Sequence, residues 1–176
     1  MKSYGDNKRI SDWLYTEISA YLAENHKPGL MEAPKSEYSF GSSPVPFENI
    51  PNAASSLEYR VNALDESFTQ MLMRKIAEEG LTDSECYRMA NIDRKHFSKI
   101  RSNENYNPSK KTALALAVAL ELNLDETRDL LLKAGMALTR SSTFDLIMIY
   151  CIQNKVFDIH EINCILFEYG QPTLGV

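Results

Sequence analysis

The chain has few of the residues from which disulfide frameworks, metal sites and catalytic sites are built. Its three cysteines, Cys86, Cys151 and Cys164, are widely spaced and form neither a disulfide framework nor a CxxC pair. His160 and Cys164 stand four residues apart, but with Cys151 as the one plausible third ligand they do not complete a tetrahedral metal set. No glycine-rich phosphate loop occurs, and no Ser/His/Asp or Cys/His set has supporting context. We therefore expect neither a cofactor nor an enzymatic activity.

Long apolar runs are also missing. The longest, residues 113–120 and 146–152, are far shorter than the roughly 20 residues of a membrane-spanning helix. No basic segment followed by an apolar one opens the chain, so no signal peptide is predicted. These absences indicate a soluble protein of the cytoplasm without a membrane partner.

An overall excess of positive charge is lacking as well. The net charge is −5, so bulk charge does not predict binding to a polyanion. The charges are uneven, however: residues 61–140 carry 12 basic and 12 acidic residues, residues 1–60 carry 6 and 8, and residues 141–176 carry 1 and 4. A local positive face is therefore expected only in the middle of the chain.

Two N-terminal segments differ sharply in composition. Residues 9–25 place apolar side chains at helical spacing and predict an amphipathic helix, whose stripe needs a surface on its own domain or on another protein. Residues 26–56 hold five of the seven prolines, which predicts an arm without regular structure. We expect a division into this helix and arm, residues 1–56, and a helical bundle, residues 57–176.

The bundle is predicted from periodicity and from helix caps. Apolar spacing returns at Leu57, with Asn62 or Asp65 as the start of a helix that Gly80 ends. Further helices are predicted over residues 82–91, 93–102, 109–122, 123–134, 142–154 and 158–169. Their predicted caps are Thr82 with Glu85, Asp93, Ser109, Asn123 with Glu126, Ser141 or Ser142, and Asp158 with Glu161. With no credible strand, the fold class is all-α.

The stretch from Leu81 to Arg101 predicts two short helices joined by a tight turn. The first helix ends at Asn91, a residue type that tolerates left-handed geometry, and Asp93 caps the second. Two helices joined by so short a turn meet at a steep angle, which is the geometry of a helix-turn-helix. The residues expected to point inward are Ile92, Phe97 and Ile100.

The order of these residues resembles the Cro/repressor-type (XRE) helix-turn-helix family over about residues 64–135. Thr82, Asp83 and Glu85 stand where that family begins its second helix, and Ser98 and Ile100 match its recognition helix. Residues 108–120 and 124–131 look like its fourth and fifth helices. The resemblance implies a lambda-repressor-like bundle, here with an N-terminal helix, an arm and two extra C-terminal helices. Three positions depart from the pattern: Tyr87 replaces a small alanine, Asn91 replaces the turn glycine, and Arg101 replaces a common glutamate.

In the docking mode of this family the second helix of the pair, here residues 94–102, enters the major groove of double-stranded DNA. Residues 94–111 carry six basic side chains and one acidic side chain, a local charge of +5. Arginine pairs well with guanine, whereas Lys110 and Lys111 are expected beside the phosphate backbone. The start of the preceding helix at Thr82 is expected to offer amides to a phosphate. The candidate DNA-binding residues are Thr82, Arg94, Lys95, His96, Ser98, Lys99, Arg101, Lys110 and Lys111.

The sequence supports two functional hypotheses. The first is a sequence-specific, DNA-binding transcription regulator, acting as a homodimer because one helix-turn-helix covers a half-site. Under that hypothesis the last two predicted helices, residues 142–154 and 158–169, either extend the bundle or form the dimer seam. The second is a protein-interaction adaptor, antitoxin-like or defence-associated, which binds a partner through residues 9–56 and uses the helix-turn-helix as scaffold.

Overall fold

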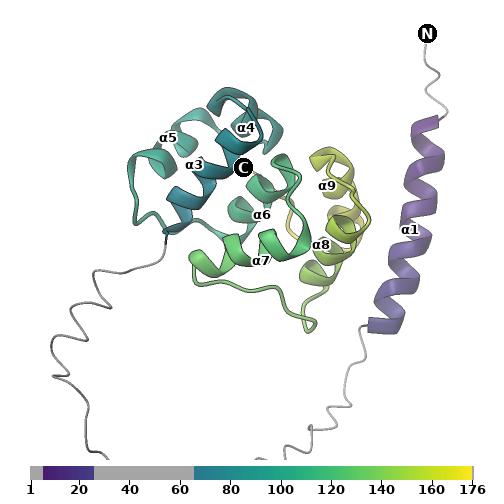
Figure 1. The fold of residues 1–176 in the computed structure, drawn as a ribbon. Helices are drawn as coiled ribbons and strands as arrows, with labels where there is room; N and C mark the ends of the chain where they lie inside the picture. The colour runs from purple at the N-terminus through teal and green to yellow at the C-terminus, as the bar shows by residue number, and fades with distance from the viewer. Residues whose placement is uncertain (1–5, 26–65, 176) are drawn as a thin grey trace, which may run out of the picture. The chain divides into compact units, whose positions relative to one another are not determined.

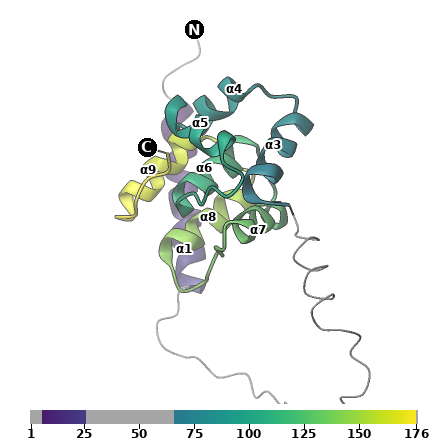
Figure 2. The ribbon, with the colours of Figure 1, turned by 90° about the vertical axis from the view of Figure 1, so that its left-hand side faces the viewer.

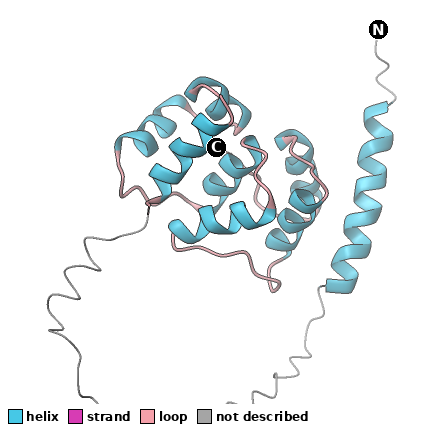
Figure 3. Ribbon diagram, in the orientation of Figure 1, coloured by secondary structure: helices cyan, strands magenta, loops and turns pink. Residues whose placement is uncertain are grey.

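The fold of the described residues consists of helices. The computed structural model describes residues 6–25 and 66–175, with side chains from residue 13 onward, and within these ranges it contains eight helices and no strand (Figures 1 and 3). The helices are α1 (Asp6–Asn25), α3 (Phe68–Glu78), α4 (Asp83–Met89), α5 (Arg94–Ser102), α6 (Lys110–Ala119), α7 (Leu124–Lys133), α8 (Thr143–Gln153) and α9 (Ile159–Glu168). The all-α class predicted from the sequence is confirmed. The predicted arm, residues 26–56, lies outside the described residues.

The helices begin at side chains that satisfy their free amide groups. Thr82 and Asn123 each form a capping box, in which the cap accepts from the backbone of the third helical residue and that residue's carboxylate accepts from the backbone of the cap. Asp93, Ser109, Ser142 and Asp158 also cap helices. Asp158 accepts from the amides of His160 and Glu161 without the reciprocal bond of a capping box. Local chemistry therefore fixes these starts.

Two helix boundaries differ from the prediction. Helix α3 begins at Phe68, because Ser67 and Gln70 form a capping box and residues 66–67 are not helical. A helix continuous from Leu57, Asn62 or Asp65 is therefore wrong, and residues 57–65 lie outside the described residues. Helix α6 ends at Ala119 rather than Leu122, since Glu121 takes a left-handed φ of 49° and the amide of Leu122 donates to the Ala117 carbonyl.

The core is centred on α6 and α8. Residues 112–120 are buried without exception, and α6 contacts α4, α7 and α9. Residues 144–152 are likewise buried, and α8 contacts α1, α7 and α9. A helix that is apolar on all sides needs neighbours on all sides, which explains why the two helices lie inside the bundle. None of the helices described in the structure is long and apolar enough to span a membrane.

Helix α1 covers part of α8 with its apolar stripe. Leu14 and Ile18 are buried, and the rings of Tyr21 and Tyr150 pack with their centroids 5.2 Å apart. The Ser19 and Tyr169 hydroxyls form a hydrogen bond that reaches from α1 to the end of α9. The stripe thus lies on the chain's own bundle, and α1 belongs to the same compact unit as residues 66–175.

Candidate nucleic-acid interface

The α4–α5 pair is joined by a tight turn, residues 90–93. Asn91 has a φ of 50°, which reverses the chain, and the amide of Ile92 donates to the Tyr87 carbonyl at 2.8 Å. Ala90 and Ile92 are buried beneath the turn. The left-handed residue, the inward isoleucine and the Asp93 cap predicted from the sequence are all present. These contacts define how α5 leaves α4.

One side of α5 is buried in the bundle. Phe97 and Ile100 are buried, and the Tyr87 ring of α4 lies against Phe97 with centroids 5.9 Å apart. The end of α5 is held by α3, because the Thr69 hydroxyl lies 3.2 Å from the Ile100 carbonyl oxygen and 3.0 Å from that of Asn103. Tyr87 therefore adds an aromatic contact between the two helices.

The opposite side of α5 is exposed and basic. Arg94, Lys95, Ser98 and Lys99 are exposed, and none of their side chains has a hydrogen bond or ion pair with a residue described in the structure. Side chains at positions i, i+1, i+4 and i+5 share one half of a helix surface. The four residues therefore form one surface, which we call the α5 basic face.

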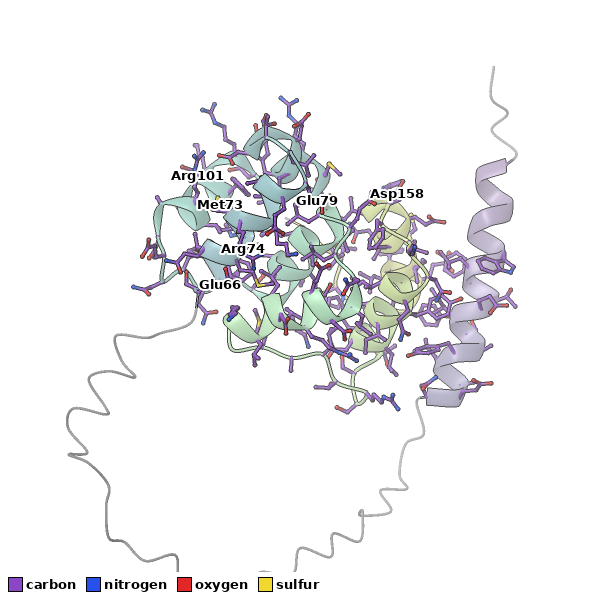
Figure 4. All side chains as sticks on the ribbon, in the orientation of Figure 1. Glu66, Met73, Arg74, Glu79, Arg101 and Asp158 are labelled. Atoms are coloured by element: carbon purple, nitrogen blue, oxygen red, sulfur yellow. The ribbon has the colours of Figure 1, made fainter. Side chains whose placement is uncertain are left out.

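Arg101, at the C-terminal end of α5, is already paired. Its guanidinium donates to the Asp83 carboxylate at the start of α4, so the ion pair links the two helices. The Arg101 side chain is labelled in Figure 4. Both side chains remain accessible to water, and pairs of this kind contribute little net stability. The positive charge that the sequence assigned to DNA is here balanced by Asp83.

His96 also has a partner within the chain. Its Nε2 atom lies 2.8 Å from the hydroxyl of Tyr106, which belongs to the loop between α5 and α6. The two rings meet edge to face, and both side chains are half-buried. His96 therefore holds the loop against α5, and it is not part of the exposed surface formed by its neighbours.

The two lysines at the start of α6 have different surroundings. The Lys110 Nζ atom donates to Oδ2 of Asp145 at 2.7 Å, and that carboxylate is 1% exposed. The same oxygen accepts from the backbone amide and the hydroxyl of Thr139, at 2.8 and 3.1 Å. Lys111 is exposed, without a side-chain partner among the described residues. Lys110 therefore neutralises a buried carboxylate of α8, and Lys111 remains available at the surface.

A groove of about 650 Å³ separates the start of α4 from α5. Four of the DNA-binding residues predicted from the sequence line this groove: Thr82, Arg94, Ser98 and Arg101. The Glu85 carboxylate accepts from the backbone amide of Thr82 at 2.8 Å and from its hydroxyl at 2.7 Å. The hydrogen bond from the Thr82 backbone amide lowers the pKa of the Glu85 carboxyl, because it stabilises the charged carboxylate. The amide of Thr82 is thus already satisfied by a carboxylate of its own helix.

The three cysteines and the two described histidines, His96 and His160, do not line this groove. Burial raises the pKa of the Cys86 and Cys151 thiols to about 12, so both stay protonated at neutral pH. His160 and Cys164 are exposed, whereas Cys151 is buried. Among the residues that the structure describes, no group of three or more His, Cys, Asp or Glu side chains is placed to hold a metal ion.

Comparison with protein-family models, with curated proteins and with solved structures gives no match to this chain. Sequence reasoning missed the acidic partners Asp83 and Asp145, which balance two of the six basic residues between positions 94 and 111. In the sequence, the sign of such pairing was an acidic residue in the first turn of α4 and of α8. An acidic residue at this place is ordinarily explained by its interaction with the helix dipole, so no basic partner was predicted.

Proposed function

We propose that the protein is a sequence-specific DNA-binding transcription regulator of the lambda-repressor-like helix-turn-helix type. In this arrangement α5 enters the major groove and α4 crosses the phosphate backbone. The observation that carries the proposal is the α5 basic face: Arg94, Lys95, Ser98 and Lys99 are exposed and unpaired, while the opposite side of the helix is held by the core. A rigidly seated helix with free donors on its outer side suits the reading of base edges.

The unpaired donors divide into two roles. The first residues of a recognition helix approach base edges, so Arg94, Lys95 and Ser98 are assigned to base contacts. Arginine offers the fork that matches the O6 and N7 atoms of guanine. Lys99 and Lys111 are assigned to phosphates, which position the protein without reading sequence. Arg101, His96 and Lys110 support the site through their partners within the chain.

The number of free cations predicts the salt dependence of binding. Arg94, Lys95, Lys99 and Lys111 are the exposed basic residues of the 94–111 stretch that have no ion pair in the described structure. Of these, Lys99 and Lys111 are assigned to phosphates, which gives a slope of log K against log salt of about −1.8 per protomer. Phosphate contacts by Arg101 and Lys110 as well would give a slope of about −3.6. The two ion pairs thus have a measurable consequence.

Fluorescence anisotropy with labelled duplexes tests the proposal. Fragments from the region upstream of the protein's own gene are titrated between about 50 and 200 mM salt, with an unrelated duplex of equal length as control. We expect affinity to fall with salt for both duplexes and to be higher for the upstream fragment. Binding that does not change with salt, or no binding to any duplex, contradicts the proposal.

We propose further that the regulator binds as a homodimer, because one helix-turn-helix reads a half-site. The dimer seam suggested by the sequence lies in α8 and α9, where most of the apolar residues are buried within one chain. Phe167 differs, with 76% of its surface exposed. Sedimentation of the protein alone and with its DNA measures how many protomers associate. A dimer that Phe167→Ala weakens supports a dimer seam at α9. A complex of one protomer with one duplex contradicts the dimer.

A role as a protein-interaction adaptor is the second candidate, and the exposure of Trp13 favours it. Trp13 is 58% exposed on α1, although the apolar stripe of that helix lies on α8. An aromatic residue of this size is a common anchor in protein interfaces. If Trp13→Ala abolishes binding of a partner protein while duplex DNA is bound neither before nor after the change, the adaptor role replaces the regulator.

A further inference from the structure

The segment after α9, residues 171–175, is fastened to the bundle. The Asn163 side chain pairs with the backbone of Leu174 in both directions: the amide of Leu174 donates to Oδ1 at 2.7 Å, and Nδ2 donates to the carbonyl oxygen of Leu174 at 3.1 Å. Leu174 itself is 2% exposed. A paired backbone and a buried leucine hold this segment in one place. We call residues 171–175 the C-terminal strap.

The strap ends against the turn between α4 and α5. Figures 1 and 2 mark the C-terminal end of the chain. Gly175 has a φ of +79°, and a Cβ atom added there would lie 2.5 Å from the backbone oxygen of Asn91. The same atom would lie 3.0 Å from Cβ and 3.1 Å from Nδ2 of Asn91. Asn91 is the left-handed residue of the turn, and the next residue, Ile92, is buried. The strap therefore touches the residue at which the chain changes direction before α5.

We propose that the C-terminal strap positions the recognition helix by fixing the backbone of the α4–α5 turn. This inference rests on the proposed function, in which α5 reads base edges. Asn163 and Gly175 are then positioning residues, which act on DNA through Asn91 and do not touch it. The contact also accounts for asparagine at a left-handed position where glycine would be unstrained, since the Asn91 side chain packs on Gly175.

The proposal predicts a change in specificity and not only in stability. Base contacts depend on direction and distance, so a small rotation of α5 weakens them strongly, whereas charge attraction to phosphates tolerates it. Loosening the strap should therefore lower the affinity for the specific duplex more than the affinity for an unrelated one. A purely structural role would alter the folded fraction and affect both duplexes alike.

Two glycine variants form a matched pair for the test. Gly175→Ala and Gly170→Ala each place an alanine at a positive φ, of +79° and +63°. A Cβ at Gly170 meets nothing within 4 Å, whereas one at Gly175 collides with the turn. The strain of a left-handed alanine is thus similar in both, and only Gly175→Ala disturbs Asn91.

The measurements are amide chemical shifts of residues 90–95 and the ratio of specific to unrelated duplex affinity. For Gly175→Ala we expect shifted amides in that range and a ratio lower by about fivefold or more. For Gly170→Ala we expect shifts confined to the end of α9 and an unchanged ratio. Wild-type shifts and ratio in Gly175→Ala would overturn the proposal. If the wild-type protein itself binds no duplex specifically, the proposed function fails, and the shifts alone then decide whether the strap sets the turn.

Variants of Asn163 test the strap without a collision. Asn163→Leu removes both hydrogen bonds to Leu174, and Asn163→Asp keeps the acceptor for the Leu174 amide while losing the donor. We expect Asn163→Leu to shift the amides of residues 90–95 and to lower the affinity ratio, with a smaller effect from Asn163→Asp. Changes restricted to residues 171–175 in both variants would overturn the proposal even if Gly175→Ala failed to fold.

Discussion

Whether a charged side chain near α5 can contact a ligand depends on whether it already has a partner. Arg94, Lys95 and Lys99 have none among the described residues, but the guanidinium of Arg101 is bound by Asp83. A paired cation contributes less to the field at the surface, and its release from the carboxylate costs energy on binding. The sequence alone gives all four residues equal weight, and the structure separates them.

The first prediction at this scale concerns base reading by Arg94. Arg94→Ala should weaken binding to the specific duplex by about 1–3 kcal/mol and relax preference at one base position. Arg128→Ala is the control, because Arg128 is an exposed arginine on α7 that pairs with Asp125. Competition binding with a set of single-base variants of the site measures both effects. Equal losses in the two variants would show that bulk charge, and not a base contact, is involved.

The second prediction concerns the adjacent lysines of α6. Lys110→Met leaves the buried Asp145 carboxylate without its cation and should lower the free energy of unfolding by about 2 kcal/mol. This is below the effect for a fully buried pair, because 29% of the Lys110 side chain is exposed and Thr139 still donates to Asp145. Lys111→Met should change stability by less than about 0.5 kcal/mol. Urea denaturation measures both.

The same two variants separate stability from DNA contact. Lys111→Met should weaken binding to all duplexes alike and reduce the slope of log K against log salt by about 1. For Lys110→Met, the molecules that remain folded should bind with an unchanged slope. A reduced slope in Lys110→Met would restore that residue to the phosphate contacts predicted from the sequence.

At the scale of helices, ion pairs tie α3, which supports α5, to its neighbours. Lys75 of α3 lies 2.7 Å from Glu126 at the start of α7 and 3.1 Å from Glu78 of its own helix. Arg74 of the same helix bridges Glu78 and Glu66, at 2.7 and 2.6 Å. Arg74 and Glu66 are labelled in Figure 4. Helix α3 contacts both α5 and α7, and the Lys75–Glu126 pair adds a charged contact between α3 and α7.

The third prediction follows from the Lys75–Glu126 pair. The hydrogen bond from Lys75 lowers the pKa of the Glu126 carboxyl below its usual 4.5. Since the folded-state pKa is the lower one, the carboxylate contributes stability at pH values above 4.5, and this is lost as the pH falls through the folded-state pKa. Glu126→Gln keeps an acceptor for the Asn123 amide but removes the charge.

We expect Glu126→Gln to lower the free energy of unfolding by about 0.5 kcal/mol at neutral pH, a small value because the pair is partly solvated. The difference from wild type should disappear in acid. Glu121→Gln, at an exposed position without a described partner, should show no such pH-dependent difference. Denaturant titrations across the acid range provide the comparison, and a loss that persists in acid would contradict the ion-pair explanation.

At the scale of the whole molecule, an N-terminal helix and a C-terminal strap from distant parts of the chain complete the bundle. Helix α1 packs on α8, and the strap reaches the turn at Asn91. Both contacts join residues separated by more than eighty positions, so they depend on the tertiary fold and not on local sequence. The strap contact links residues 171–175 to the α4–α5 pair without adding residues to its exposed surface.

The fourth prediction concerns the seating of α1. Ile18 is 0% exposed, so Ile18→Ala should lower the free energy of unfolding by about 2–4 kcal/mol and accelerate hydrogen exchange in the α1 amides. Trp13→Ala, at an exposed position of the same helix, should cost less than about 1 kcal/mol. If the two variants behave alike, the apolar stripe of α1 is not held by α8 in solution and remains available to another protein.

The sequence by itself determined the all-α class, most helix starts and the residues beneath the α4–α5 turn. Thr82, Asp93, Ser109 and Asn123 cap their helices through atoms two or three residues away, so the chemistry is local and readable. Local patterns failed where two of them competed: apolar spacing from Leu57 predicted a longer α3, but the capping box at Ser67 starts the helix at Phe68.

Tertiary structure decided which site residues are free. Lys110 and Asp145 are 35 positions apart, Arg101 and Asp83 are 18 apart, and Gly175 meets Asn91 from the far end of the chain. No local spacing encodes such pairs, because they depend on how packed helices bring separate turns together. The α5 basic face was visible in the sequence as a charge count, but its unpaired residues emerged only when the folded chain supplied carboxylates to the others.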